Sequence, residues 1–184
     1  PPNKIAIRDL SANQSLTYKE LDDRACLLAS WLQKSGVKKG DRIAILSQNC
    51  AEFFELEFAC AKIGAIELPL NWRLTKPELE YILNDSTPEV LIYDHSFADI
   101  SGELVKDCNI SESLEINKDD PDSQYELTLR ESNSDFQEPE ITQEDLIMIM
   151  YTSGTTGHPK GAMINHQMQL YNVINLASPA FVAT

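Results

Sequence analysis

The sequence predicts an α/β fold with a mostly parallel sheet flanked by helices, and two observations carry this prediction. Over residues 1–98, short apolar runs alternate with amphipathic helical stretches. Strands separated by helices of about 10 to 15 residues indicate βαβ crossovers and a parallel sheet. Two of the helical stretches also open with a capping-box pattern, in which Ser or Thr is followed three residues later by Glu. The 184 residues, 42% hydrophobic and 24% charged, have a globular composition.

The predicted elements follow in order along this region. Two short strands at 4–8 and 15–17 precede a helix over 17–35, which Thr17 and Glu20 cap and Gly36 ends. Further strands are expected at 42–47, 66–70 and 89–93, and further helices at 51–63 and 75–84. No Gly-x-Gly-x-x-Gly follows any of these strands, so a dinucleotide-binding fold of the Rossmann type has no support.

The overall charge excludes several classes of partner. With 15 basic and 29 acidic residues, the net charge is −14. Nucleic acids and anionic membrane surfaces are bound by surplus cations, so neither is an expected partner. The longest apolar run, Leu146–Tyr151, is far shorter than the roughly 20 residues of a transmembrane helix. Four scattered cysteines without metal-ligand spacing favour reduced thiols and a cytoplasmic location.

Charge also divides the chain into three parts. Residues 1–98 carry 14 acids and 11 bases, residues 99–145 carry 15 acids and three bases, and residues 146–184 carry one base and no acid. We expect 1–98 to form the βαβ unit and 99–145 to be an acidic, solvated surface connection with short local elements. Residues 146–184 read as a strand, a loop, a second strand and a helix.

The loop in the last part carries the chemistry. It follows the apolar strand 146–150 and reads Tyr-Thr-Ser-Gly-Thr-Thr-Gly-His-Pro-Lys-Gly over 151–161. Glycines let backbone N–H groups approach phosphate oxygens, hydroxyls donate hydrogen bonds without adding charge, and Lys160 adds a cation. The pattern therefore favours a polyphosphate ligand. A Gly/Ser/Thr surface turn without any ligand is the alternative that composition alone leaves open.

The loop is not the P-loop of the common NTPases. That motif needs Gly-x-x-x-x-Gly-Lys-Ser/Thr at the start of a helix. Here His158 and Pro159 separate Gly157 from Lys160, a strand is expected at 162–164, and the helix begins only near His166.

Residues 151–161 resemble the signature of the adenylate-forming, or AMP-binding, superfamily, which includes acyl-CoA synthetases, aryl-CoA ligases, peptide-synthetase adenylation domains and luciferases. Two further segments are similar to this family, Leu-Thr-Tyr-Lys-Glu-Leu at 16–21 and Ala-Lys-Ile-Gly-Ala with Leu-Pro-Leu-Asn at 61–71. Pro-Leu-Asn-Trp-Arg-Leu at 69–74 favours the acyl-CoA synthetase branch and, with it, fatty acid metabolism. A luciferase-like or coumarate-ligase-like member would look much the same here.

The resemblance implies a site and a reaction. The residues implied to bind the β- and γ-phosphates of ATP are Thr152, Ser153, Gly154, Thr155, Thr156, Gly157 and Lys160. The implied enzyme is an ATP-dependent acid–thiol ligase that uses Mg²⁺, activates a carboxylic acid as acyl-AMP and transfers the acyl group to CoA. No catalytic or metal-binding residue is implied within these 184 residues. The acyl substrate and the oligomeric state stay open.

The ends of the chain suggest a fragment. It starts Pro-Pro-Asn without Met and stops inside the apolar stretch 180–183. We expect an N-terminal part of the large AMP-binding domain, with the rest of that domain and the C-terminal domain absent, and we expect the fragment alone to be inactive. The alternative is a naturally short, non-catalytic nucleotide-binding or interaction module of the same fold.

Overall fold

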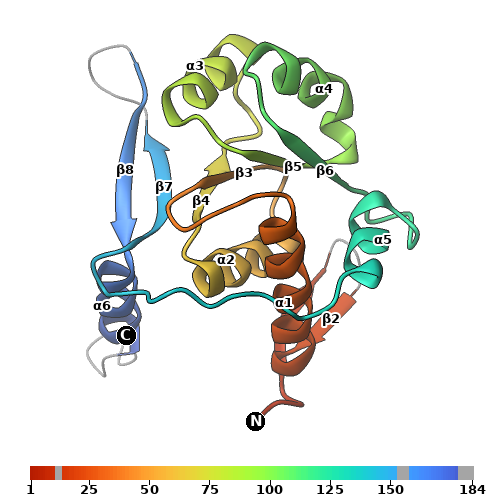
Figure 1. Cartoon of the computed structure of the whole chain (residues 1–184), viewed down its shortest axis with the longest axis vertical. Helices are drawn as coiled ribbons and strands as arrows, with labels where there is room; N and C mark the ends of the chain where they lie inside the picture. Colours follow the sequence, from red (N-terminus) through yellow and green to blue (C-terminus); the bar gives the residue numbers. More distant parts are fainter. Residues whose placement is uncertain (11–13, 153–157, 178–184) are drawn as a thin grey trace.

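The computed structural model describes residues 1–10, 14–152 and 158–177, and it has a six-stranded sheet as its middle layer (Figure 1). The strand order is β6-β5-β3-β4-β7-β8. The strands are β3 (Arg42–Leu46), β4 (Ile66–Leu70), β5 (Val90–Asp94), β6 (Glu112–Ile116), β7 (Leu146–Thr152) and β8 (Lys160–Asn165). The first five in this order run parallel and β8 is antiparallel to β7. The predicted α/β class with a mostly parallel sheet is confirmed.

Helices cover both faces of the sheet. Helices α1 (Tyr18–Lys34), α2 (Ala51–Ile63) and α5 (Gln124–Glu131) pack on one face, and α3 (Lys76–Ser86) and α4 (Ala98–Asp107) on the other (Figure 1). The remaining elements are the antiparallel ribbon β1 (Ile5–Asp9) and β2 (Gln14–Thr17), the short helix η1 (His95–Phe97) and α6 (His166–Ala177). Within the described residues, no helix is both long enough and apolar enough to cross a membrane.

Local sequence signals place the helix ends where they were predicted. The backbone N–H groups of Thr17 and Thr75 each donate to the Glu three residues on, at 2.8 Å in both cases. Gly64 ends α2 with φ of 69°, a left-handed conformation that glycine adopts without strain. These caps satisfy end groups that the helices themselves leave unpaired.

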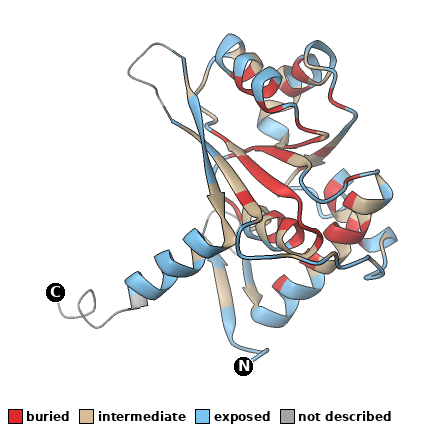
Figure 2. Cartoon of the chain, turned by 60° about the vertical axis from the view of Figure 1, so that its left-hand side comes forward, coloured by how far each residue is buried: buried red, intermediate tan, exposed pale blue. Residues whose placement is uncertain are grey.

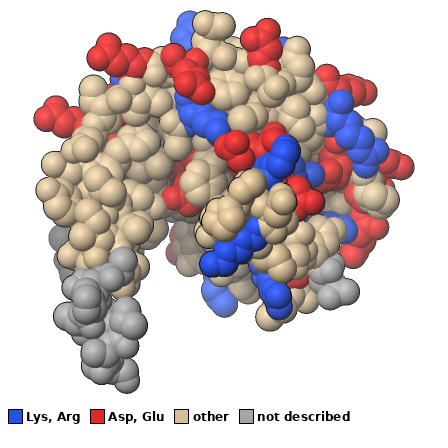
Figure 3. Space-filling view, turned by 90° about the horizontal axis from the view of Figure 1, so that it is seen from below, with Lys and Arg blue, Asp and Glu red and all other residues tan. Residues whose placement is uncertain are grey.

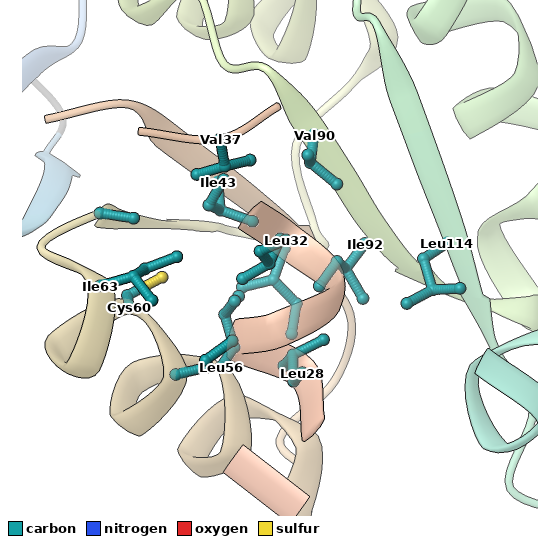
Figure 4. Packing of buried hydrophobic residues seen from close by; sticks show 14 of the residues in the cluster. Leu28, Leu32, Val37, Ile43, Leu56, Cys60, Ile63, Val90, Ile92 and Leu114 are labelled. Carbon is teal, nitrogen blue, oxygen red and sulfur yellow. The ribbon is translucent and has the colours of Figure 1, made fainter. Parts of the chain in front are cut away.

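Successive side chains of each buried strand point to opposite faces of the sheet, which divides the core into two clusters. Ile43 and Ile45 of β3 face α1 and α2, whereas Ala44 and Leu46 face α3 and α4. Figure 4 shows the first cluster, in which Leu28 and Leu32 of α1 and Leu56, Cys60 and Ile63 of α2 surround the strand residues. Figure 2 shows buried residues along the central strands and on parts of the helices that cover them, while α6 lies exposed at the side of the molecule.

Residues 99–145 differ from the expected surface connection. They contain most of α4, all of β6 and all of α5, and β6 is a full strand of the main sheet. Each element buries a few apolar side chains among many acidic ones, namely Leu104, Leu114, Ile116, Tyr125 and Leu129. The acidic residues dominate the composition because they occupy the solvent side, and they conceal the sparse inward-facing pattern. The longest stretch of this region without a helix or strand is 132–145.

A charged network joins three helices beneath the sheet. The Arg24 guanidinium of α1 donates to Glu55 of α2 at 2.7 Å and to both carboxylate oxygens of Glu126 in α5, at 2.5 and 3.0 Å. The buried Tyr125 hydroxyl donates to the other oxygen of Glu55 at 2.8 Å. Burial raises the pKa of the Glu55 carboxyl, and Arg24 opposes that rise. The network therefore ties α5, late in the sequence, to the first two helices.

We predict that Arg24→Ala lowers the free energy of unfolding by about 3 kcal/mol, because it leaves the Glu55 carboxylate buried without its cation. Urea denaturation of the purified chain measures this change. Arg130→Ala is the matched control, since Arg130 pairs with Asp122 at the surface. The control should cost less than about 1 kcal/mol. Equal losses in the two variants would contradict the structural role of the network.

A buried carboxyl in β4 predicts a pH dependence of stability. Glu67 is 1% exposed, and burial, with the charge of Glu57 as a smaller cause, raises its pKa to about 8. The unfolded chain loses this proton near pH 4.5 and the folded chain only near pH 8, so stability falls as the pH rises between these values. Glu67→Gln removes this loss.

We predict that Glu67→Gln raises the free energy of unfolding by roughly 3 kcal/mol more at pH 8 than at pH 5.5. Urea denaturation at the two pH values, with the exposed Glu112→Gln as control, measures the difference. A pH dependence that is the same in the two variants and the unaltered chain would show that Glu67 does not titrate in this way.

Candidate functional site

A groove lies where the parallel strands end. The residues that follow β3 and β4, including Ser47, Asn49 and Asn71, line it together with the end of β7 and one side of α3. Its volume is about 930 Å³, and Trp72 and Met150 contribute apolar surface. In open parallel sheets, ligands bind outside the carboxyl ends of the strands, at the point where successive connections leave in opposite directions. The chain meets this condition beside β3, because β4 lies on one side of it and β5 on the other.

The described ends of the signature, at 151–152 and 158–161, belong to an antiparallel hairpin at this edge. Thr152 is the last residue of β7 and Lys160 the first of β8, and the two are paired in register. Both are exposed. The structure thus brings together two of the sequence-predicted phosphate-binding residues from the two arms of one hairpin. The other predicted site residues, Ser153, Gly154, Thr155, Thr156 and Gly157, lie outside the described residues.

The strands and the helix after the loop confirm the sequence-based distinction from a P-loop. After the loop the chain forms β8, and α6 begins only at His166. The backbone N–H of His166 donates to the Asp145 carbonyl oxygen at 3.1 Å. His166 therefore stands at the start of the helix, where the sequence predicts that the helix begins. The Nε2 atom of its ring is buried and has no hydrogen-bond partner among the described residues.

Two side-chain contacts connect the hairpin with α3. The Tyr151 hydroxyl donates to the Asp85 carboxylate, and burial, together with Asp85, raises the Tyr151 pKa. The rings of Tyr81 and His158 stack with centroids 4.9 Å apart and an angle of 23° between their planes. Both contacts lie at the groove, since Tyr81, Tyr151 and His158 line it.

The electrostatic setting of the site contrasts with the rest of the chain. Residues 146–184 hold no acid, and Figure 3 shows the lobe at the left, which includes β7, β8 and α6, with little red or blue. Arg73 adds a cation at the groove, with its guanidinium carbon 4.1 Å from the centroid of the Trp72 ring. Glu78, the acid that lines the groove, is held by the Thr75 hydroxyl and backbone N–H at 2.7 and 2.8 Å.

Sequence reasoning missed three of these residues as parts of the site. Tyr81 and Asp85 lie about 70 positions before the residues they contact, and nothing in the spacing of the sequence links the two segments. Arg73 could have been predicted from the sequence. It follows a predicted parallel strand, and residues in that position meet at the carboxyl edge of the sheet. Trp72 is partly buried against the core beside α3 and α4 and also lines the groove.

Metal binding has less support than phosphate binding. Among the residues that the structure describes, no group of three or more His, Cys, Asp or Glu side chains is placed to hold a metal ion. All four cysteines lie among the described residues and are free thiols. Burial raises the pKa of Cys50 to about 12, which disfavours the thiolate form that binds metals. Cys60 is fully buried in the core, where a thiol is unreactive.

Comparison with known proteins gives consistent results. The family described as AMP-binding enzyme matches residues 1–183. Feruloyl-CoA synthase of Amycolatopsis sp is 35% identical over 177 residues, which cover 95% of this chain and 33% of that protein. The long-chain-fatty-acid–CoA ligase FadD13 of Mycobacterium tuberculosis is 35% identical over 175 residues, which cover 90% of this chain and 33% of that protein.

Solved structures share the fold. ATP-bound MatB from Rhodopseudomonas palustris has a TM-score of 0.83 at 30% identity, over 95% of this chain and 34% of that one. The inhibitor-bound N-terminal domain of FACL13 from Mycobacterium tuberculosis has a TM-score of 0.79 at 34% identity, over 90% of this chain and 41% of that one. The chain spans about a third of the length of the curated relatives it matches. From its fold, its hairpin signature and these similarities, the chain belongs to the family of AMP-binding enzymes.

Proposed function

We propose that this chain supplies the triphosphate-binding part of an ATP-dependent acyl-CoA ligase. The observation that carries the proposal is the hairpin at the carboxyl edge of the sheet, where Thr152 and Lys160 stand opposite one another at the two ends of the signature. A hydroxyl and an ammonium group beside a glycine-rich loop suit a polyphosphate, because they donate hydrogen bonds and add positive charge. The absence of acids from residues 146–184 removes a source of repulsion for such a ligand.

The proposed reaction has two steps. The carboxylate of the acid attacks the α-phosphorus of ATP, the bond to the bridging oxygen breaks, and acyl-AMP and pyrophosphate form. The thiol of CoA then attacks the acyl carbon, and AMP leaves as the thiol proton is lost. Residues 152–157 and Lys160 bind the β- and γ-phosphates, so they hold the pyrophosphate group in place as charge develops on it.

The relatives suggest the class of acid and the supporting partners. Their names include ligases for ferulate and for long-chain fatty acids. We propose a carboxylic acid from the aromatic or fatty class, with fatty acid metabolism as one setting, and CoA as the acceptor. Mg²⁺ accompanies ATP in the proposal, but no described residue of this chain is assigned to it. The four free thiols support a reducing, cytoplasmic location.

Recovery of the native protein with an antibody against residues 1–184 tests the function. Its intact mass should far exceed 20.7 kDa, because the chain spans about a third of its relatives. It should catalyse exchange of pyrophosphate into ATP when supplied with ferulate, indoleacetate or a long-chain fatty acid. A native mass near 20.7 kDa without exchange would instead support the short, non-catalytic module. Exchange by residues 1–184 alone would contradict the expectation that the fragment is inactive.

In an active native protein, we predict that Thr156→Ala slows pyrophosphate exchange about 100-fold, because it removes one donor to the developing charge on pyrophosphate. Lys160→Ala should slow it less, by about tenfold, because Lys160 is exposed at the start of β8. The control is Lys106→Ala, an exposed lysine of α4. Rates equal to those of the control in both variants would rule out the phosphate-binding assignment.

A further inference from the structure

The hairpin reaches past the strand that supports it. β4 pairs with β7 at Glu67 and Met148, which places Leu70, the last residue of β4, level with Tyr151. Thr152 therefore lies beyond the end of the neighbouring strand, and β8 is the edge of the sheet among the described residues. Figure 1 shows the two arms rising together beside α3. Backbone pairing with the sheet alone does not fix the direction of this projecting end.

One face of α3 contacts both arms of the hairpin. Tyr81 and Asp85 are four residues apart in α3 and so lie one above the other on the helix surface. Asp85 accepts the hydrogen bond from Tyr151 in the first arm, and Tyr81 stacks on His158 just before the second. A hydrogen bond and a ring contact from the same helix thus hold the two sides of the loop.

The last glycine of the signature makes the first of these contacts possible. Gly161 pairs with Tyr151 across the hairpin. A Cβ atom at position 161 would lie 2.8 Å from the Ile149 Cγ2 atom and 3.2 Å from the Tyr151 ring, closer than packed atoms allow. Glycine therefore leaves room for the tyrosine ring over the β8 backbone, from where its hydroxyl contacts Asp85.

Helix α3 is itself firmly held and can act as a fixed support. Leu79, Ile82 and Leu83 are buried in the core. At its first residue, Lys76 forms ion pairs with Glu103 and Asp107 of α4, at 2.7 and 2.8 Å. A side chain of α3 that contacts the hairpin is thus anchored to the body of the domain.

We propose that Tyr81 and Asp85 are positioning residues for triphosphate binding. They act through His158 and Tyr151 and set the direction in which the hairpin end presents Thr152 and Lys160 to the phosphates. This role rests on the proposed function, since it concerns the same ligand. It adds two residues outside the signature to the machinery that binds ATP, and it explains why the signature contains an aromatic residue at 151 and a glycine at 161.

The test uses the native protein and five variants. Tyr81→Ala removes the ring contact and Tyr81→Phe keeps it, whereas Asp85→Ala removes the hydrogen-bond acceptor and Asp85→Asn keeps one. The matched control is Asp99→Ala, which removes an exposed carboxylate at the second residue of the neighbouring helix α4. Pyrophosphate exchange gives KM for ATP and, separately, KM for the acid, and hydrogen–deuterium exchange of residues 146–165 reports on the hairpin.

The two alanine substitutions should weaken the binding of ATP and leave the binding of the acid nearly unchanged. Tyr81→Ala and Asp85→Ala should each raise KM for ATP about three- to tenfold, as expected for the loss of one ring contact or one hydrogen bond to a charged group. KM for the acid should change less than twofold. Deuterium uptake should rise in 146–165 and not in α1 or α2. Tyr81→Phe and Asp85→Asn should restore most of the ATP affinity, and Asp99→Ala should leave both constants unchanged.

Other results would overturn the inference in distinguishable ways. If the unaltered protein is active and KM for ATP stays the same in Tyr81→Ala and Asp85→Ala, the positioning role is wrong while the proposed function stands. If both KM values rise together, or uptake rises throughout the domain, the two residues serve general stability and the inference is equally overturned. If the unaltered protein shows no exchange with any acid, the proposed function fails and the positioning role fails with it.

Discussion

Pairing of β7 with β4 is the interaction on which the arrangement of the site depends. β7 is separated from β4 in the sequence by α3, β5, α4, β6 and α5, yet it returns to lie beside it, with Met148 next to Glu67. This return brings the signature to the same edge as the residues that follow β3 and β4. Sheet hydrogen bonds fix the register, and a shift by one residue would turn Tyr151 away from α3.

Acidic residues are unevenly distributed between the body of the fold and the candidate site. The acids of residues 99–145 lie in α4, β6 and α5 and in the connections between and after them, and Glu126 among them joins the Arg24 network that fastens α5. The hairpin and α6 carry Lys160 and no acid. A strongly acidic chain can therefore present an anion-binding edge, because screening limits the reach of distant surface charges to about 10 Å.

The sequence predicted the α/β class, the three central strands and both capping boxes, because these follow from local patterns. It did not reveal β6, whose apolar residues Leu114 and Ile116 are two short signals inside an acidic stretch. It located the signature between two strands, but not the support from α3. Contacts such as Tyr81 with His158 depend on tertiary packing of distant segments, and no local pattern records them.

We propose that the end of the β7–β8 hairpin binds the triphosphate of ATP, and a structure of the native protein with bound ATP decides the matter. The β- and γ-phosphates should lie next to Thr152 and Lys160, with Tyr81 still stacked on His158. A triphosphate bound elsewhere in the groove or on another face, with the hairpin making no contact to it, would contradict the claim.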